Sequence, residues 1–198
     1  LQEVWNELRH IIIIKKFLIA FFIYSSALQT VLIIATYFGE QEIAWKEGTK
    51  TTGLIISILL IQLIAIIGAM FTAKISKKIG NIRTLLILNL IWAFLCIGAY
   101  FIKEPIEFYI AAGAVGLVMG GIQALSRSTF SKLIPDTDNT TSYFSFYDVS
   151  QKVSIVLGMT LFAILDQTTG SMRISILIFV LIFLIGAFLL NKIKIKNV

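Results

Sequence analysis

The chain has 198 residues, of which 58% are hydrophobic and 14% are charged, and its formal net charge is +6. Soluble domains are about 45–50% apolar with about a quarter of their residues charged, so this composition excludes a water-soluble globular domain. The single cysteine, Cys96, excludes a disulfide framework, and the single histidine, His10, leaves few metal or acid–base schemes. We therefore expect no enzyme, no metal site and no cofactor.

The N-terminal segment differs from the rest of the chain. Val4, Trp5 and Leu8 lie along one face of a helix, and charged residues occupy the other positions. This pattern is typical of a helix that lies on a membrane surface. The sequence therefore predicts a cytoplasmic surface helix or linker at 1–14 and a helical bundle at 15–198.

Apolar runs long enough to cross a membrane follow one another along the chain. A hydrocarbon core of about 30 Å needs roughly 20 helical residues, and only a helix or a closed barrel satisfies its own backbone polar groups in lipid. Five runs contain no Asp, Glu, Lys or Arg, and a sixth begins near Tyr143. We predict an all-α, integral membrane six-helix bundle, with spans at about 17–38, 52–73, 84–102, 107–126, 143–166 and 173–191.

Basic residues gather on one side of this predicted bundle. Apart from Lys152, which lies in the fifth span, twelve Lys and Arg fall on the side of the two termini and four on the other side. Such an excess marks the cytoplasmic side, so we predict that both termini are cytoplasmic. The net positive charge then faces anionic lipid, and we expect no nucleic-acid partner.

The first predicted span carries a polar stripe. Ser26, Gln29 and Thr30 share one helical face at about 100° per residue. In lipid, such a stripe must meet protein or a water-filled cavity. It predicts either the lining of a solute pathway or hydrogen bonds between helices, and the sequence leaves both possibilities open.

The fourth predicted span contains a ridge of small residues. Ala112, Gly116 and Gly120 recur at a spacing of four. This pattern lets a second helix approach closely, so it predicts a packing surface between helices. A helix contact that moves during function would leave the same pattern.

The fifth predicted span contains both an acid and a base. Only thirteen uncharged residues separate Lys152 from Asp166, too few to cross the bilayer, so the helix must carry charge into the membrane. Each such charge costs roughly 2.5–3.5 kcal/mol, and Asp148 and Lys152 can pair at i,i+4. The pair predicts part of a solute or proton pathway. Alternatively, the span begins at Val149, Asp148 lies at the headgroups and Lys152 reaches the cytoplasm.

Several stretches resemble one known family. "GLVMGGIQALSRSTFSKLIP", "FSFYDVSQKVSIVLG" and "QTTGSMRISIL" are similar to the vacuole-effluxer branch of the major facilitator superfamily, named for autophagy-related vacuolar amino-acid effluxers and including many bacterial members. The resemblance covers nearly the whole chain and implies the C-terminal half of a transporter fold. It also implies a missing N-terminal six-helix half, small polar solutes such as amino acids and, in a bacterium, the plasma membrane.

One motif of the superfamily departs from its usual form. The cytoplasmic loop pattern Gly-x-x-x-Asp-basic-x-Gly falls on "AKISKKIG", in which Gly80 matches, Lys78 holds the basic position and Arg83 follows. Ala73 and Lys77 replace the first Gly and the Asp. The resemblance therefore implies a gating loop formed by Lys77, Lys78, Gly80 and Arg83 that lacks its acidic latch.

These features together predict a secondary transporter that works by alternating access. Ser26, Gln29 and Thr30 would line the solute cavity. Asp148 and Lys152 would pair differently in the inward-open and outward-open states, and Asp148 would couple transport to protons. The expected partners are a small solute, membrane lipid and the missing half. A half-size protein that pairs with a second copy and a non-transporting membrane scaffold or receptor remain as alternatives.

Overall fold

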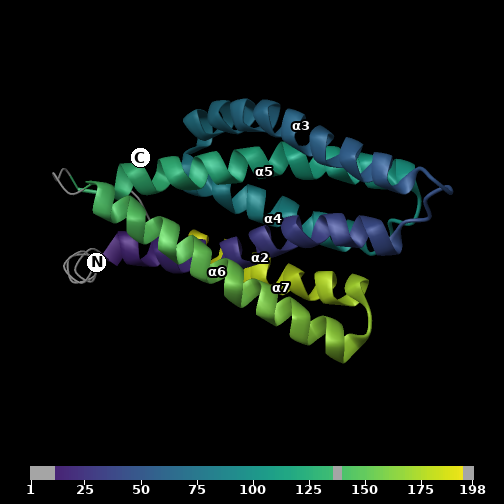
Figure 1. Ribbon diagram of the computed structural model, residues 1–198. Helices are drawn as coiled ribbons and strands as arrows, with labels where there is room; N and C mark the ends of the chain where they lie inside the picture. Colours follow the sequence, from purple (N-terminus) through teal and green to yellow (C-terminus); the bar gives the residue numbers. More distant parts are fainter. Residues whose placement is uncertain (1–11, 136–139, 194–198) are drawn as a thin grey trace.

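The computed structural model describes residues 12–135 and 140–193, and in these residues it is a bundle of long helices (Figure 1). The helices are α2 Ile12–Glu42, α3 Lys50–Ile79, α4 Asn81–Ala99, α5 Pro105–Leu133, α6 Thr140–Thr169 and α7 Met172–Asn191. All six are long and apolar enough to cross a membrane. The predicted surface segment falls almost wholly on residues 1–11, which lie outside the described residues, and α2 already includes Ile12.

The predicted spans coincide with these helices except at one end. The third span was predicted to reach residue 102, but α4 ends at Ala99. The carbonyls of Tyr100 and Ile102 accept hydrogen bonds from Arg173 at 2.8 and 2.6 Å instead of continuing the helix. The chain then turns into α5, which begins with Pro105 at its first position. A backbone N–H at that position has no partner within the helix, so the missing N–H of proline costs no helical hydrogen bond.

Successive helices run antiparallel, so α2 begins and α7 ends at the same end of the bundle (Figure 1). α3 packs mainly on α5, α6 packs mainly on α2, and α4 and α7 pack on each other. α4 also contacts α5, and α7 correspondingly contacts α2. If α2, α3 and α4 are exchanged for α5, α6 and α7 respectively, each of these helix contacts becomes a contact of the same set. This is the relation expected of inverted repeats.

Small residues bring α3 and α5 into direct backbone contact. A methyl group added at Gly116 of α5 would lie 2.6 Å from the carbonyl oxygen of Ile61, and one at Gly120 would overlap the carbonyl of Ala65. In return, Gly68 of α3 lies against the backbone of Leu117. The third residue of the predicted ridge, Ala112, is buried on the same helix. These glycines determine how closely the two helices approach.

α6 is attached to the bundle along a narrow stripe. Its buried residues are Tyr143, Tyr147, Ser154, Gly158 and Phe162, and most of its other side chains are exposed or half-buried. At Gly158 the helix lies directly against α2, because a methyl group there would overlap Ser26 O and the Thr30 hydroxyl.

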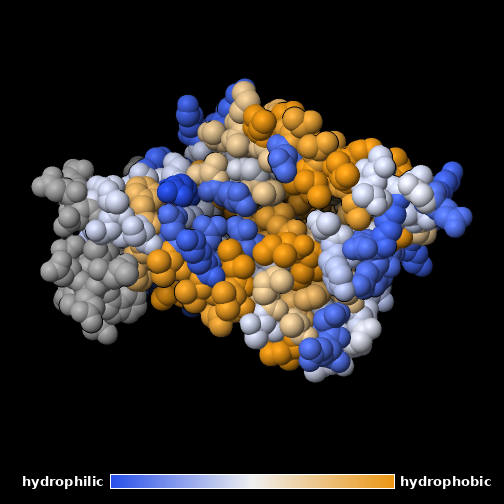
Figure 2. All heavy atoms as spheres, in the orientation of Figure 1, coloured by the Kyte–Doolittle hydropathy of each residue, from blue (hydrophilic) through white to orange (hydrophobic). Residues whose placement is uncertain are grey.

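The surface of the bundle is largely apolar (Figure 2). Exposed large hydrophobic residues include Leu63 and Ile66 on α3 and Phe94 on α4, as expected of helices that face lipid. The face in Figure 2 also carries a hydrophilic patch in its left half, over α5 and α6. Polar surface at that position needs an explanation other than contact with acyl chains.

Candidate solute pocket between α2, α5 and α6

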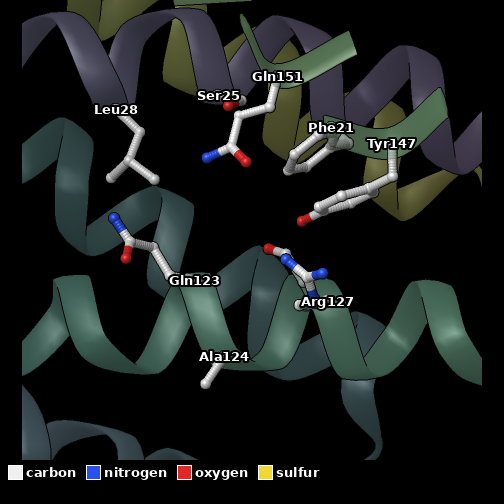
Figure 3. Close-up of a pocket in the computed structure, with 9 residues that line it drawn as sticks. Phe21, Ser25, Leu28, Gln123, Ala124, Arg127, Tyr147 and Gln151 are labelled. Carbon is white, nitrogen blue, oxygen red and sulfur yellow. The ribbon is translucent and has the colours of Figure 1, made fainter. Parts of the chain in front are cut away.

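A pocket of about 270 Å³ lies between α2, α5 and α6 (Figure 3). Each helix contributes residues spaced three or four apart, which lie on one helical face. α2 contributes one such set, α5 a second around Gln123 and Arg127, and α6 a third. The lining residues are Phe21, Ser25, Leu28, Gln123, Ala124, Ser126, Arg127, Tyr147 and Gln151.

Two side-chain amides point into this pocket from opposite walls. Gln123 comes from α5 and Gln151 from α6, and both extend into the space between the helices (Figure 3). Both residues are half-buried, and neither amide has a hydrogen-bond partner among residues 12–135 and 140–193. Each amide offers two N–H donors and one carbonyl acceptor, so together they can bind a polar solute through hydrogen bonds.

Ser25 adds a buried hydroxyl to the same wall. Its side chain is 0% exposed, and its Oγ has no hydrogen-bond partner in the described part of the chain. The neighbouring Tyr24 hydroxyl, in contrast, lies 2.7 Å from Ser126 Oγ. Because Ser126 donates its own proton to Ile122 O, Tyr24 must be the donor in that pair. Ser25 is therefore a buried hydroxyl of this wall that has no partner among the described residues.

An ion pair joins α5 and α6 beside the pocket. Arg127 Nη1 lies 3.4 Å from Asp148 Oδ1, and the two side chains are 58% and 44% exposed. The Arg127 guanidinium also lies over the Phe144 ring, 5.2 Å from its centroid. An exposed pair of this kind contributes little stability in water, yet two charges facing lipid would be costly. This surface therefore suits contact with water or protein.

Aromatic rings form the wall of the pocket next to this ion pair. Phe21 stacks on Tyr147 with ring centroids 4.2 Å apart, and the ring centroids of Phe130 and Tyr147 are 5.0 Å apart. Phe21 also meets Tyr24 edge-to-face. These rings pack α2, α5 and α6 together and fix the direction in which the Tyr147 side chain enters the pocket (Figure 3).

The residues predicted to form the solute or proton pathway do not line this pocket in the structure. Asp148 pairs with Arg127 of α5 instead of Lys152, which is exposed and has no ion-pair partner in the described residues. The expected i,i+4 pair is therefore not formed, because Asp148 lies close enough to the neighbouring helix to meet its arginine. Asp148 itself lies beside the pocket and is not one of its lining residues.

The predicted polar stripe of α2 also lies beside this pocket rather than in it. Ser26 donates to Ile23 O of its own helix at 2.7 Å, and Gln29 is half-buried. Thr30 is 0% exposed at the contact with Gly158, and its hydroxyl has no partner among the described residues. Ser25, one position earlier than predicted, is the polar residue of α2 that lines the pocket.

The predicted gating loop forms the tight turn between α3 and α4. Gly80 has φ +88° and ψ 154°, a conformation that residues with a side chain rarely adopt, and its N–H donates to Ser76 O. Lys77, Lys78 and Arg83 are exposed, and none of them has an ion-pair partner in the described ranges. The turn brings three positive charges to one end of the bundle.

Residues 1–197 match the family model described as vacuole effluxer Atg22 like. The chain belongs to the Atg22-like vacuole effluxer family. Its relatives in the major facilitator superfamily include the MFS-type transporter YxiO of Bacillus subtilis strain 168, which is 28% identical over 96% of this chain and 43% of its own length.

Fungal members of the Atg22-like family are similar as well. Autophagy-related protein 22 of Eremothecium gossypii is 31% identical over 86% of this chain and 34% of its own length. The Saccharomyces cerevisiae protein of the same name is 29% identical over 98% of this chain and 39% of its own length. The chain thus spans less than half the length of the relatives it matches.

Several lining residues of this Atg22-like chain escaped the sequence-based prediction, although a signal for them exists. Phe21 and Ser25, Gln123 and Arg127, and Tyr147 and Gln151 are each four residues apart. Each pair therefore places a polar group next to an aromatic or polar one on a single helical face. Such spacing identifies the face, but it does not show that the three faces converge.

Proposed function

We propose that this chain is the C-terminal six-helix half of a secondary transporter, and that a small polar solute binds in the pocket between α2, α5 and α6. The observation that carries the proposal is a set of hydrogen-bonding groups around one pocket that have no partner among residues 12–135 and 140–193. Gln123 and Gln151 point into the pocket, and Ser25 lies in its wall. Membership of the Atg22-like family and the relative named as an MFS-type transporter support the same function.

The proposal also assigns a role to the polar face over α5 and α6. Arg127 and Asp148 would be costly if they faced acyl chains, so a second six-helix unit covers this face and completes the cavity. We propose that this unit is a further part of the same protein, and the length of the relatives, more than twice that of the matched chain, supports this. A second copy of this chain is the alternative source of the opposite wall.

Amino acids are the proposed solutes. An amino acid suits a site where charged groups lie beside neutral amides, because its polar groups find several hydrogen-bond donors and acceptors there. Protonation of Asp148 would remove its attraction to Arg127, and this provides the proposed link to a proton gradient. We place the protein in the bacterial plasma membrane, with both termini in the cytoplasm.

Transport by the intact protein in liposomes tests this function. Uptake of the twenty ¹⁴C-labelled L-amino acids is measured with and without an imposed pH gradient. We expect at least one to be taken up, and Gln123→Ala and Gln151→Ala to reduce its uptake about tenfold, as expected for the loss of one to two hydrogen bonds.

Gln62→Ala is the matched control for these amide variants, because Gln62 is exposed on α3 and does not line the pocket. Wild-type uptake in both pocket variants would remove the pocket from the solute pathway. Asp148→Asn and Lys152→Ala, assayed in the same way, separate the roles of these two charged residues of α6. Complete absence of uptake by the wild-type protein would favour a membrane scaffold or receptor.

A further inference from the structure

Arg127 is the one charged residue among the nine that line the pocket. A guanidinium has five N–H donors in a planar fork, but the described hydrogen bond of Arg127 is a single contact of 3.4 Å from Nη1 to Asp148 Oδ1. Charge-assisted hydrogen bonds between nitrogen and oxygen are usually about 2.7–2.9 Å long. Asp148 therefore engages Arg127 weakly and leaves most of its donors available.

We propose that Arg127 binds a carboxylate of the solute, and that this carboxylate competes with Asp148 for the guanidinium. This inference rests on the proposed solute pocket and specifies the chemical class that the pocket recognises. A carboxylate can bind a guanidinium through two parallel hydrogen bonds, which the present contact with Asp148 does not achieve. A solute carboxylate that accepts two hydrogen bonds from Arg127 therefore replaces Asp148, which accepts one.

The remaining polar groups lie where the rest of such a solute would be. Gln123 lies four residues before Arg127 on α5, a rise of about 6 Å along that helix. Gln151 extends into the pocket from the facing helix α6 (Figure 3). The Ser25 hydroxyl, buried and without a partner in the described ranges, borders the same space. The carboxylate thus binds at the arginine, and the other polar groups of the solute bind among the amides and the hydroxyl.

Competition for Arg127 has a mechanical consequence. In the structure, Arg127 of α5 and Asp148 of α6 link the two helices directly. When a carboxylate occupies the guanidinium, that link is replaced by contacts through the solute. The state of the pocket therefore changes how α5 and α6 are connected, which is what a solute must do to alter a conformational equilibrium.

A binding experiment on the intact protein in detergent tests this inference. The midpoint of thermal unfolding is measured with each of the twenty L-amino acids and, for every one that raises it, with the matching α-carboxamide. We expect the acid to stabilise the wild-type protein and the carboxamide, which has lost the negative charge, to stabilise it far less. Dissociation constants from the concentration dependence give the carboxylate preference.

Three variants then separate competition from a structural role of the ion pair. Arg127→Gln should weaken binding of the acid about tenfold or more and abolish the preference over the carboxamide. Asp148→Asn should tighten binding of the acid by about two- to fivefold, because it removes a competitor of modest strength. Lys132→Gln is the control for loss of a positive charge, since Lys132 is exposed on the same helix and outside the pocket.

The outcomes distinguish this inference from the proposed function. If the acid and its carboxamide bind equally and Arg127→Gln changes neither, the carboxylate site is refuted and the pocket remains the solute site. If Asp148→Asn weakens binding, the competition is refuted. If no amino acid stabilises the wild-type protein, both the carboxylate site and the proposed amino-acid solutes are refuted. Should Arg127→Gln fail to fold, the direction of the Asp148→Asn effect decides the question.

Discussion

Arg173 Nε donates to Glu42 Oε2 across 2.6 Å and thereby joins the first turn of α7 to the last residue of α2. The same guanidinium donates to the carbonyls of Tyr100 and Ile102, which follow α4, and to the carbonyl of Glu42 at 3.0 Å. The two side chains are only 16% and 27% exposed. One arginine therefore connects three helices at the end of the bundle opposite the described termini.

Replacing this arginine should destabilise the bundle clearly. Arg173→Ala leaves Glu42 and several backbone carbonyls without their donor, so we expect the free energy of unfolding to fall by about 2–4 kcal/mol. SDS-induced unfolding of the intact protein in mixed micelles, followed by circular dichroism, measures this change. Lys50→Ala is the control, because the Lys50–Glu40 pair at the same end is about half exposed and should contribute less than about 1 kcal/mol. Equal effects of the two substitutions would contradict this interpretation.

The contact between α3 and α5 should not tolerate even a methyl group. Gly120→Ala places a carbon against the carbonyl of Ala65, so the helices must separate, and we expect a loss of about 1–3 kcal/mol. Gly98→Ala makes the same substitution in α4, where nothing lies within 4 Å of the new carbon. Alanine favours the helix there, and stability should be unchanged or rise by up to about 1 kcal/mol. The same unfolding assay compares them, and a neutral Gly120→Ala would show that the helices are less closely packed than described.

The turn between α3 and α4 depends on glycine for a different reason. Gly80 has φ +88° with open space around the position of a side chain, so its constraint comes from the backbone alone. Gly80→Ala should therefore cost about 1–3 kcal/mol of unfolding free energy without any steric contact. Gly98→Ala again serves as the matched substitution. If both glycines accept alanine equally well, the turn has a conformation different from the one described.

Two buried hydroxyls should respond to removal in opposite ways. Tyr24→Phe removes the 2.7 Å hydrogen bond to Ser126, and we expect a loss of about 0.5–1.5 kcal/mol. Thr30→Val replaces a buried hydroxyl that has no partner among the described residues with a methyl group of similar size. Its removal should leave stability unchanged or raise it by up to about 1 kcal/mol. A Thr30→Val variant as unstable as Tyr24→Phe would indicate that this hydroxyl has a partner.

The helices were predictable because lipid imposes a strong constraint on sequence. Uncharged runs of about 20 residues allow little other than a helix, and five of the six spans lie within observed helices. The exception, the end of α4, depends on Arg173, which is far away in sequence. The hydropathy of the span does not predict the contact of Arg173 with the carbonyls of Tyr100 and Ile102.

The pocket was only partly predictable, because it depends on how three helices are rotated about their axes. The prediction chose Ser26 over Ser25 on α2, and a rotation of one residue, about 100°, separates the contact with α6 from the pocket wall. It also paired Asp148 with Lys152 on the same helix, because spacing within a helix is visible in sequence. The neighbouring Arg127 becomes the partner only once α5 and α6 are placed side by side.

The narrow stripe of buried residues on α6 determines how this helix can be displaced. Contacts along one stripe hold a helix to its neighbours, but they restrict a tilt of that helix less than contacts on several faces would. Gly158 touches the backbone of α2 without an intervening side chain, so a tilt of α6 would be centred on this contact. Such a tilt would move the half of α6 that carries Tyr147 and Gln151, and the width of the pocket would change with the tilt angle of α6.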